Sequence, residues 1–136
     1  MNQPHHLVAL VTLLALIFFM WTALRVGAAR ARYNVPAPAM SGAPEFDRAF
    51  RIQMNTLEGL VLFLPALWLF ALYWNDLVAA GAGAVWILGR IIYAVGYSAA
   101  PQHRSWGFSI QSLASIFLLL GGLVGIGMAI AGGGLF

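Results

Sequence analysis

The chain has 136 residues, of which 62% are hydrophobic and only 8% are charged. An ordinary soluble domain is about one quarter charged, so this chain lacks the polar surface that a water-soluble fold needs. Its net charge is +3, and all seven of its lysine and arginine positions are arginine. It has no cysteine, which excludes a disulfide framework, a thiolate metal site and a cysteine nucleophile.

Four apolar stretches are long enough to cross a bilayer, since roughly 30 Å of hydrocarbon takes about 20 helical residues. They lie approximately at 7–29, 56–74, 77–97 and 110–131. The first stretch lacks the basic start of a signal peptide and is too long for one, so we interpret it as a retained helix. The sequence predicts a single all-α integral membrane domain over 1–136. Its four transmembrane helices are expected at about 7–29, 44–74, 77–98 and 108–131.

The placement of the basic residues predicts the orientation of the bundle. Four arginines flank the first connection, and His103 and Arg104 lie in the third. The opposite side offers only Asp76 and uncharged tails. The positive-inside rule therefore predicts that the first and third connections are cytoplasmic and both termini outside. The short chain and this pattern suit a bacterial inner membrane.

The second predicted helix begins with a polar stripe. Pro44 suits a first helical turn, and Glu45 and Asp47 follow where the helix dipole favours negative charge. At about 100° per residue, the next polar side chains fall within roughly an 80° arc. This helix-2 stripe consists of Arg48, Arg51, Asn55 and Glu58. Gln53 points to a different side, toward another helix or another subunit.

A second stripe lies on the third predicted helix, where Arg90, Tyr93 and Tyr97 share a face. A charge at a helix centre costs about 2.5–3.5 kcal/mol even on a lenient insertion scale, so neither Glu58 nor Arg90 is expected to face lipid. Either these two residues satisfy each other or hold the bundle together, or the stripes line a polar pocket open to the cytoplasm. For Arg90 and Arg48 we expect the structural role, in a polar core.

Several arginines beside an asparagine, a glutamine and a carboxylate suit a small zwitterionic ligand with more than one carboxylate. Arginine binds carboxylates as a fork, and a glutamate accepts an ammonium group. Residue chemistry alone predicts a polar anionic ligand at the membrane interface. We expect no bound metal, because His5 and His6 at the N-terminus are a poor basis for a site, and no nucleic-acid partner.

Two segments resemble a known family. The segment "FDRAFRIQMNTLEGLVLFLPALW" (46–68) resembles the second-helix signature of the membrane-associated proteins in eicosanoid and glutathione metabolism, the MAPEG family. That signature is an acidic residue and arginine, then Arg-x-x-x-Asn-x-x-Glu, then an apolar run with proline. The segment "GRIIYAVGYSAAPQHRSWG" (89–107) is similar to the third helix and following loop of the same family. The resemblance covers nearly the whole chain.

Within the family, the chain looks most like the microsomal glutathione transferases of the leukotriene-C-synthase branch. The resemblance implies a homotrimer with three glutathione sites at subunit interfaces, and a hydrophobic, lipid-soluble electrophile that arrives from the membrane lipid. Arg30 and Gln53 would reach in from the neighbouring subunit, and Arg104 would be the catalytic residue beside the glutathione sulfur. One subunit would bind glutathione, a co-substrate, through Arg51, Asn55, Glu58, Tyr93 and Tyr97.

The chemistry expected of Arg104 follows from thiol acidity. A free thiol has a pKa of about 8.5, so only a small fraction is thiolate at neutral pH. A fixed cation within about 4–6 Å favours the anion, by about one to three pKa units for a carboxylate beside arginine. Arginine suits this role because it stays protonated.

Three positions depart from the family pattern. Gly59 stands where close relatives often carry tyrosine, and Ala31 where leukotriene-C synthase has a second arginine assigned to opening its epoxide. Ser105 after Arg104 resembles prostaglandin E synthase. These departures leave detoxification of hydrophobic electrophiles or reduction of lipid hydroperoxides, a peroxidase activity, as the expected chemistry.

Two alternatives come from other functional classes. The chain could be a non-catalytic lipid-binding member of the five-lipoxygenase-activating-protein type, although such proteins lose part of the glutathione set that is complete here. It could also be a small transporter that uses Glu58 and Arg90 as a proton relay. The polar groups gather at one side rather than spanning the membrane, which argues against a relay.

Overall fold

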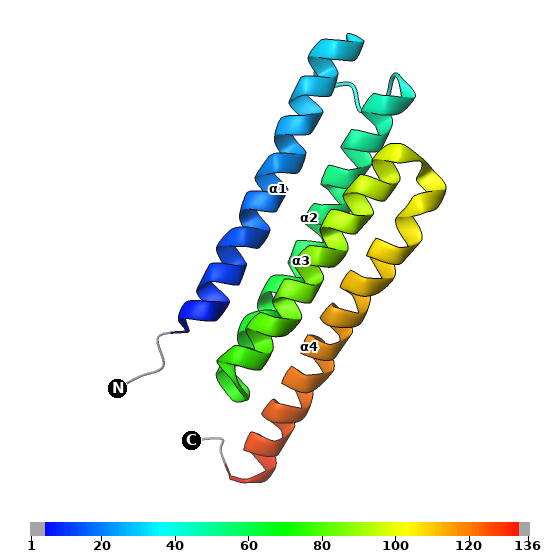
Figure 1. Ribbon diagram of the computed structural model, residues 1–136. Coiled ribbons are helices and arrows are strands. Elements are labelled where there is room, and N and C mark those ends of the chain that lie inside the picture. The colour runs from blue at the N-terminus through cyan, green and yellow to red at the C-terminus, as the bar shows by residue number, and fades with distance from the viewer. Residues whose placement is uncertain (1–4, 134–136) are drawn as a thin grey trace.

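The computed structural model describes residues 5–133 and consists of four long helices that run up and down in one bundle (Figure 1). The helices are α1 (His6–Tyr33), α2 (Pro44–Tyr73), α3 (Asp76–Ala99) and α4 (Ser105–Ala131), and a single 3-10 turn, η1 (Pro101–Arg104), precedes α4. No strand occurs within the described residues. All four helices are long and apolar enough to span a membrane. The predicted all-α bundle of four transmembrane helices is confirmed.

The helix ends follow from local sequence. Asn34 adopts a left-handed conformation (φ 55°), and its N–H bonds the carbonyl of Arg30, so α1 continues past the predicted end at 29. α2 starts at Pro44, the expected residue. Asn75 caps α3 by accepting a hydrogen bond from the backbone N–H of Val78 at 2.9 Å.

The last helix begins earlier than predicted, at Ser105 instead of about 108. Gly107 is a buried helical residue, and a Cβ on it would collide with the backbone of Tyr93. A Cβ on Gly89, in α3, would lie 2.7 Å from the backbone nitrogen of Gln111. These glycines therefore serve the close packing of α3 against α4, as small residues do between membrane helices.

In the bundle, α2 and α3 form the centre, and α1 and α4 pack on them from opposite sides (Figure 1). α1 begins and α4 ends at the same end of the bundle. The C-terminal part of α1, the start of α2 and η1 lie toward the other end. This second end carries all of the arginines outside α3.

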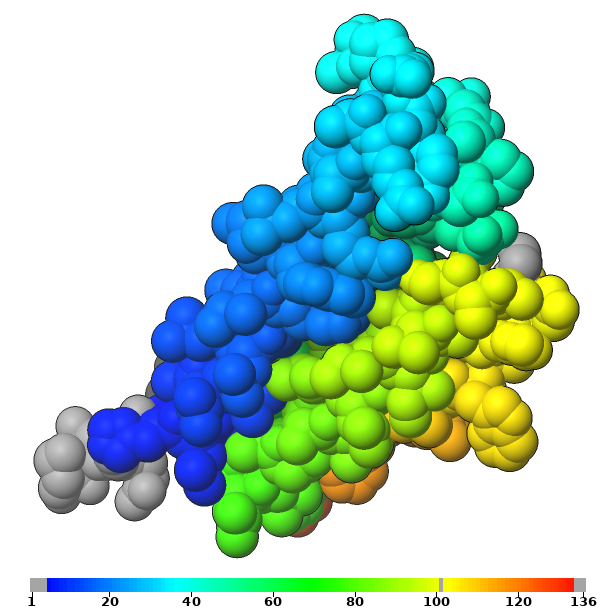
Figure 2. All heavy atoms as spheres, turned by 45° about the horizontal axis from the view of Figure 1, so that its top comes forward, coloured from blue at the N-terminus to red at the C-terminus, as the bar shows by residue number. Residues whose placement is uncertain are grey.

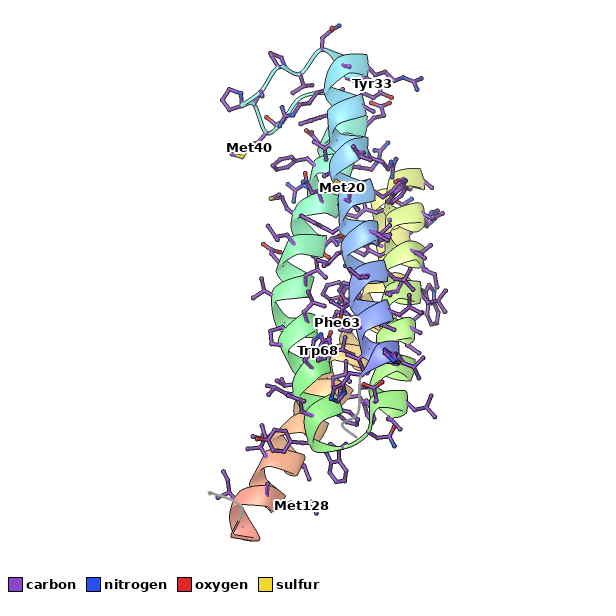
Figure 3. All side chains as sticks on the ribbon, turned by 90° about the vertical axis from the view of Figure 1, so that its left-hand side faces the viewer. Met20, Tyr33, Met40, Phe63, Trp68 and Met128 are labelled. Atoms are coloured by element: carbon purple, nitrogen blue, oxygen red, sulfur yellow. The ribbon has the colours of Figure 1, made fainter. Side chains whose placement is uncertain are left out.

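The half of the bundle toward the start of α1 is filled by aromatic side chains. Toward the end where α1 begins, Phe63 stacks on Trp86 with ring centroids 4.1 Å apart, and Trp68 donates to Thr12 Oγ1 at 2.9 Å. Figure 3 shows Phe63 and Trp68 directed into the space between the helices. Many large apolar side chains point outward, such as Leu24, which is 66% exposed. That outer surface suits lipid rather than water.

Candidate functional site

The two predicted stripes meet in one pocket at the arginine-bearing end. The pocket has a volume of about 330 Å³ and lies between α2, α3 and η1. This volume is at the lower end of the range of about 300–1,000 Å³ that is usual for small-molecule sites. It is called the Arg104 pocket below, and its lining residues are Arg51, Met54, Asn55, Glu58, Tyr93, Tyr97 and Arg104.

The base of the Arg104 pocket is organised by Arg90, whose side chain is fully buried. Its Nη1 donates to Asn55 Oδ1 at 2.7 Å, and its Nη2 donates to Thr56 Oγ1 at 2.6 Å. The guanidinium carbon also lies 4.4 Å from the centroid of the Tyr93 ring. Because Asn55 Oδ1 accepts from Arg90, the amide nitrogen of Asn55 is the group left to donate to a ligand.

These contacts show which residues accept hydrogen bonds from Arg90. The acceptors are Asn55 and Thr56, and no ion pair between Arg90 and Glu58 occurs within the described residues. Thr56 is an acceptor that was not predicted from the sequence. Its signal was available, because a buried arginine needs acceptors and Thr56 is the polar residue next to Asn55 in the apolar part of the helix.

Aromatic contacts connect the base of the Arg104 pocket to its rim. The rings of Tyr93 and Tyr97 meet edge to face at 5.6 Å. The Arg104 guanidinium carbon lies 5.8 Å from the Tyr97 ring centroid, within the range of a cation–π contact. A Cβ on Gly96 would collide with the carbonyl of His103, so glycine allows η1 to lie directly against α3. That approach places Arg104 beside Tyr97.

Arg48, unlike the other residues of the helix-2 stripe, does not line the Arg104 pocket. It lines a different pocket, together with residues of α1. By periodicity it lies at one edge of the arc, and the start of α2 is packed between α1 and the end of α3. Its Nε atom is buried and has no acceptor within the described residues. The structural role predicted for Arg48 stays a prediction, at a place apart from the Arg104 pocket.

Two further predicted residues lie outside the Arg104 pocket. The Nη1 atom of Arg30 donates to the carbonyls of Ala39 at 2.7 Å and Val35 at 3.3 Å, so its guanidinium braces the connection between α1 and α2. Gln53 is partly buried on α2 and does not line this pocket. Both were expected to serve the site of a neighbouring subunit, and the single chain leaves those roles as predictions.

A second polar pocket, of about 360 Å³, opens beside the first between α2 and α4. It shares Asn55 and Glu58 with the Arg104 pocket. Its polar α4 residues were not singled out in the sequence, although their spacing of three and four places them on one face. These residues are Gln111, Ser112 and Ser115.

Gly59 is one of the residues that line the second pocket. A Cβ there would lie 3.4 Å from Trp86 and 3.5 Å from Gln111 Oε1, which is ordinary contact. A tyrosine at this position, as the resemblance leads one to expect, would extend beyond that Cβ into space that this chain keeps open. The departure at Gly59 therefore leaves room beside Asn55 and Glu58.

Within residues 5–133 there is no group of three or more histidine, cysteine, aspartate or glutamate residues that could hold a metal ion. His5 bonds Asp76 at 2.9 Å, at the end of the bundle opposite to the Arg104 pocket.

The fold and the pocket together define a multi-pass integral membrane protein with a polar, arginine-lined site at one end of a four-helix bundle. The sequence profile of the MAPEG family matches residues 8–124, and the chain belongs to this family. The family resemblance found in the sequence is confirmed.

Several curated proteins are similar over most of their length. An uncharacterized protein of Synechocystis sp. is 49% identical over 118 residues, which cover 87% of this chain and 86% of that protein. Microsomal glutathione S-transferase 2 of Homo sapiens is 40% identical, with 86% of this chain and 80% of the relative covered. Leukotriene C4 synthase of Rattus norvegicus is 38% identical, with 76% and 69% covered.

Proposed function

We propose that this chain is a membrane-bound glutathione transferase whose Arg104 pocket binds glutathione and activates it as a thiolate. The observation that carries the proposal is the convergence of six residues in one pocket, from α2, α3 and η1, that the sequence had singled out for this ligand. The family, and relatives named as a glutathione S-transferase and a leukotriene C4 synthase, support the glutathione-related chemistry.

The pocket offers complementary groups to a tripeptide that has two carboxylates and one ammonium group. Arg51 suits a carboxylate, which its guanidinium binds as a fork. Glu58 suits the ammonium group, and the Asn55 amide nitrogen can donate to a peptide carbonyl. The hydroxyl groups of Tyr93 and Tyr97 can donate further hydrogen bonds. In this proposal, Arg90 is a positioning residue because it acts only through Asn55 and Tyr93.

Arg104 stabilises the thiolate. When the glutathione thiol loses its proton to water, the adjacent guanidinium lowers the free energy of the anion without competing for that proton. The sulfur then forms a bond to the electrophilic carbon, and the leaving group departs with its electron pair. With a lipid hydroperoxide, the sulfur instead attacks the outer peroxide oxygen and releases an alcohol. A second glutathione then gives the disulfide and water.

The proposal includes the assembly and the setting of the site. Three copies form a homotrimer, in which Arg30 and Gln53 reach the glutathione of a neighbouring subunit. The hydrophobic substrate enters from the lipid. The first and third connections are cytoplasmic, and the membrane is a bacterial inner membrane.

The test is the ultraviolet difference spectrum of the full-length protein on addition of glutathione, recorded for the wild type, Arg104→Gln and His103→Ala. His103 is the exposed neighbour on η1 and does not line the pocket, so it is the matched control. We expect a thiolate band in the wild type and His103→Ala, and no band in Arg104→Gln. An equally strong band in Arg104→Gln would remove Arg104 from the mechanism.

The same titration separates the rival function. Saturable glutathione binding without a thiolate band in the wild type would indicate a holding site and favour the non-catalytic lipid-binding alternative. No glutathione binding by any variant would reject the proposed function. Turnover assays with a hydrophobic halide and with a lipid hydroperoxide then distinguish transferase from peroxidase activity.

A further inference from the structure

A second cluster of arginines lies at the same end of the bundle and shares no residue with the Arg104 pocket. It lines a pocket of about 260 Å³ between α1, the start of α2 and the end of α3. We call this the arginine pocket. Its polar lining residues are Arg25, Arg32, Tyr33, Glu45, Arg48 and Ser98.

The charges of the arginine pocket are not balanced from within. Three guanidinium groups face one carboxylate, and within the described residues none of them forms an ion pair with Glu45. Arg25 Nη1 donates to Ser98 Oγ at 2.9 Å, a neutral acceptor. The buried Nε of Arg48 has no acceptor in the described part of the chain. A buried donor of this kind is costly unless an acceptor comes from outside the chain.

The surface next to the arginine pocket, further along the bundle, is apolar. α1 and α3 lie side by side on this face (Figure 2). On α1, Ile17 and Trp21 precede Arg25 at spacings of four, and Ile17 is 63% exposed. On α3, Val95 precedes Ser98 and is 64% exposed. On each helix, apolar side chains therefore lie on the same face as a polar residue of the arginine pocket, and they lie further from the arginine-bearing end of the bundle.

Trp21 marks the boundary between the two zones. The Arg25 guanidinium carbon lies 5.0 Å from its ring, which is 41% exposed. Tryptophan concentrates where the hydrocarbon meets the headgroups, because its ring is apolar and its N–H is polar. The arginine pocket is then at headgroup level, and Ile17 and Val95 are at the level of the acyl chains.

We propose that the arginine pocket binds the phosphate group of an anionic membrane phospholipid, whose acyl chains lie along the face formed by α1 and α3. Guanidinium groups match the geometry of phosphate oxygens. Basic pockets between transmembrane helices are the type of site that binds anionic headgroups. A soluble phosphate compound would leave the apolar zone unused, so the arrangement favours a lipid.

The test is native mass spectrometry of the full-length protein in neutral detergent, titrated with dioleoyl phosphatidylglycerol or dioleoyl phosphatidylcholine. The variants are Arg25→Gln, Arg32→Gln and the double variant. Arg104→Gln is the control, because it removes the same charge at the same end of the bundle but outside the arginine pocket. Arg32 is exposed, so its variant is expected to fold even if the double variant does not.

We expect the wild type to bind phosphatidylglycerol at least about tenfold more tightly than phosphatidylcholine, and each arginine variant to weaken that binding about fivefold. Arg104→Gln should bind phosphatidylglycerol like the wild type. An equal loss in Arg104→Gln would show that net charge alone attracts the lipid and would overturn the proposal. No preference between the two lipids would also overturn it.

Two competitors decide the source of the phosphate. Glycerol phosphate and inorganic phosphate at millimolar concentration should leave bound phosphatidylglycerol in place, since neither can use the apolar face. Displacement by either would identify a site for soluble phosphate and reject the lipid. Displacement by glutathione would reject the lipid and place glutathione in the arginine pocket. Displacement by either phosphate compound would leave the proposed role of Arg104 unchanged.

Discussion

The interface between α2 and α3 is closed in two different ways along its length. Near the Arg104 pocket it is closed by Arg90, which bonds Asn55 and Thr56. Further down it is closed by the Phe63–Trp86 stack. Between membrane helices, apolar burial gives little net transfer gain because lipid is as apolar as the core, so close packing and hydrogen bonds stabilise the contact. The stack contributes packing, whereas Arg90 contributes packing and also orients a ligand-facing amide.

The largest effect should come from the packed end. Trp86→Ala removes a fully buried indole and leaves a cavity against Phe63, with an expected cost of about 3 kcal/mol in the free energy of unfolding. Thermal unfolding in detergent measures this loss. Glutathione affinity of the folded fraction should remain close to the wild-type value. A specific loss of glutathione binding would show that the Phe63–Trp86 stack also contributes to the ligand site.

At the polar end, Arg104→Ala should separate activity from stability. Without the guanidinium, the thiol pKa returns toward its free value, and the thiolate-dependent rate at neutral pH should fall about 10- to 30-fold, because a free thiol is still about 3% thiolate at pH 7. The midpoint of thermal unfolding should change little, because Arg104 is exposed and an exposed cation–π contact such as the one with Tyr97 contributes only about 0.5–1 kcal/mol. Initial rates across pH provide the check, since the variant should recover activity as the pH rises toward the pKa of the free thiol.

Gly96→Ala tests whether the position of η1 matters. The added methyl group would collide with the His103 carbonyl and push η1 away from α3, at a cost of about 1–3 kcal/mol. The thiolate band should weaken because Arg104 moves from Tyr97. Gly81→Ala is the matched control, since nothing lies within 4 Å of a Cβ at that position in α3. Equal effects of both variants would contradict this account.

Thr56→Val tests how much the hydrogen bond from Arg90 to Thr56 contributes to stability and to ligand binding. The substitution keeps the shape of the side chain and removes the acceptor of Arg90 Nη2, with an expected cost of about 1–2 kcal/mol in stability. Glutathione binding should weaken by less than about tenfold, because the bond from Arg90 to Asn55 remains. Calorimetric titration and thermal unfolding measure the two effects. A full loss of binding would mean that Thr56 itself contacts the ligand.

The smallest effect is expected for Gly59→Ala. Its Cβ would meet Trp86 and Gln111 at ordinary contact distances, so stability should change by less than about 0.5 kcal/mol. If the open space beside Gly59 admits the hydrophobic substrate, the KM for that substrate should change while glutathione affinity does not. Steady-state kinetics with each substrate varied in turn would show this.

Much of the architecture could be predicted because the bilayer sets it. The hydrocarbon thickness sets the length of each span, and composition alone marks four of them. Helical periodicity likewise predicted that Arg51, Asn55 and Glu58 share a face, as do Arg90 and Tyr93. The structure confirms the four helices and brings these faces together in one pocket.

Other features depended on contacts that periodicity cannot specify. An angle around one helix does not say which neighbour packs there, so Arg48 could not be separated from the helix-2 stripe before α1 was seen beside it. The choice of Thr56 as a partner of Arg90 likewise needs the distance between α2 and α3. The early start of α4 also depends on tertiary packing, because Gly107 lets α4 approach the backbone of α3 closely. The sequence determined the spans and the polar faces, and only the tertiary structure decided which faces meet, since that depends on side-chain packing between helices.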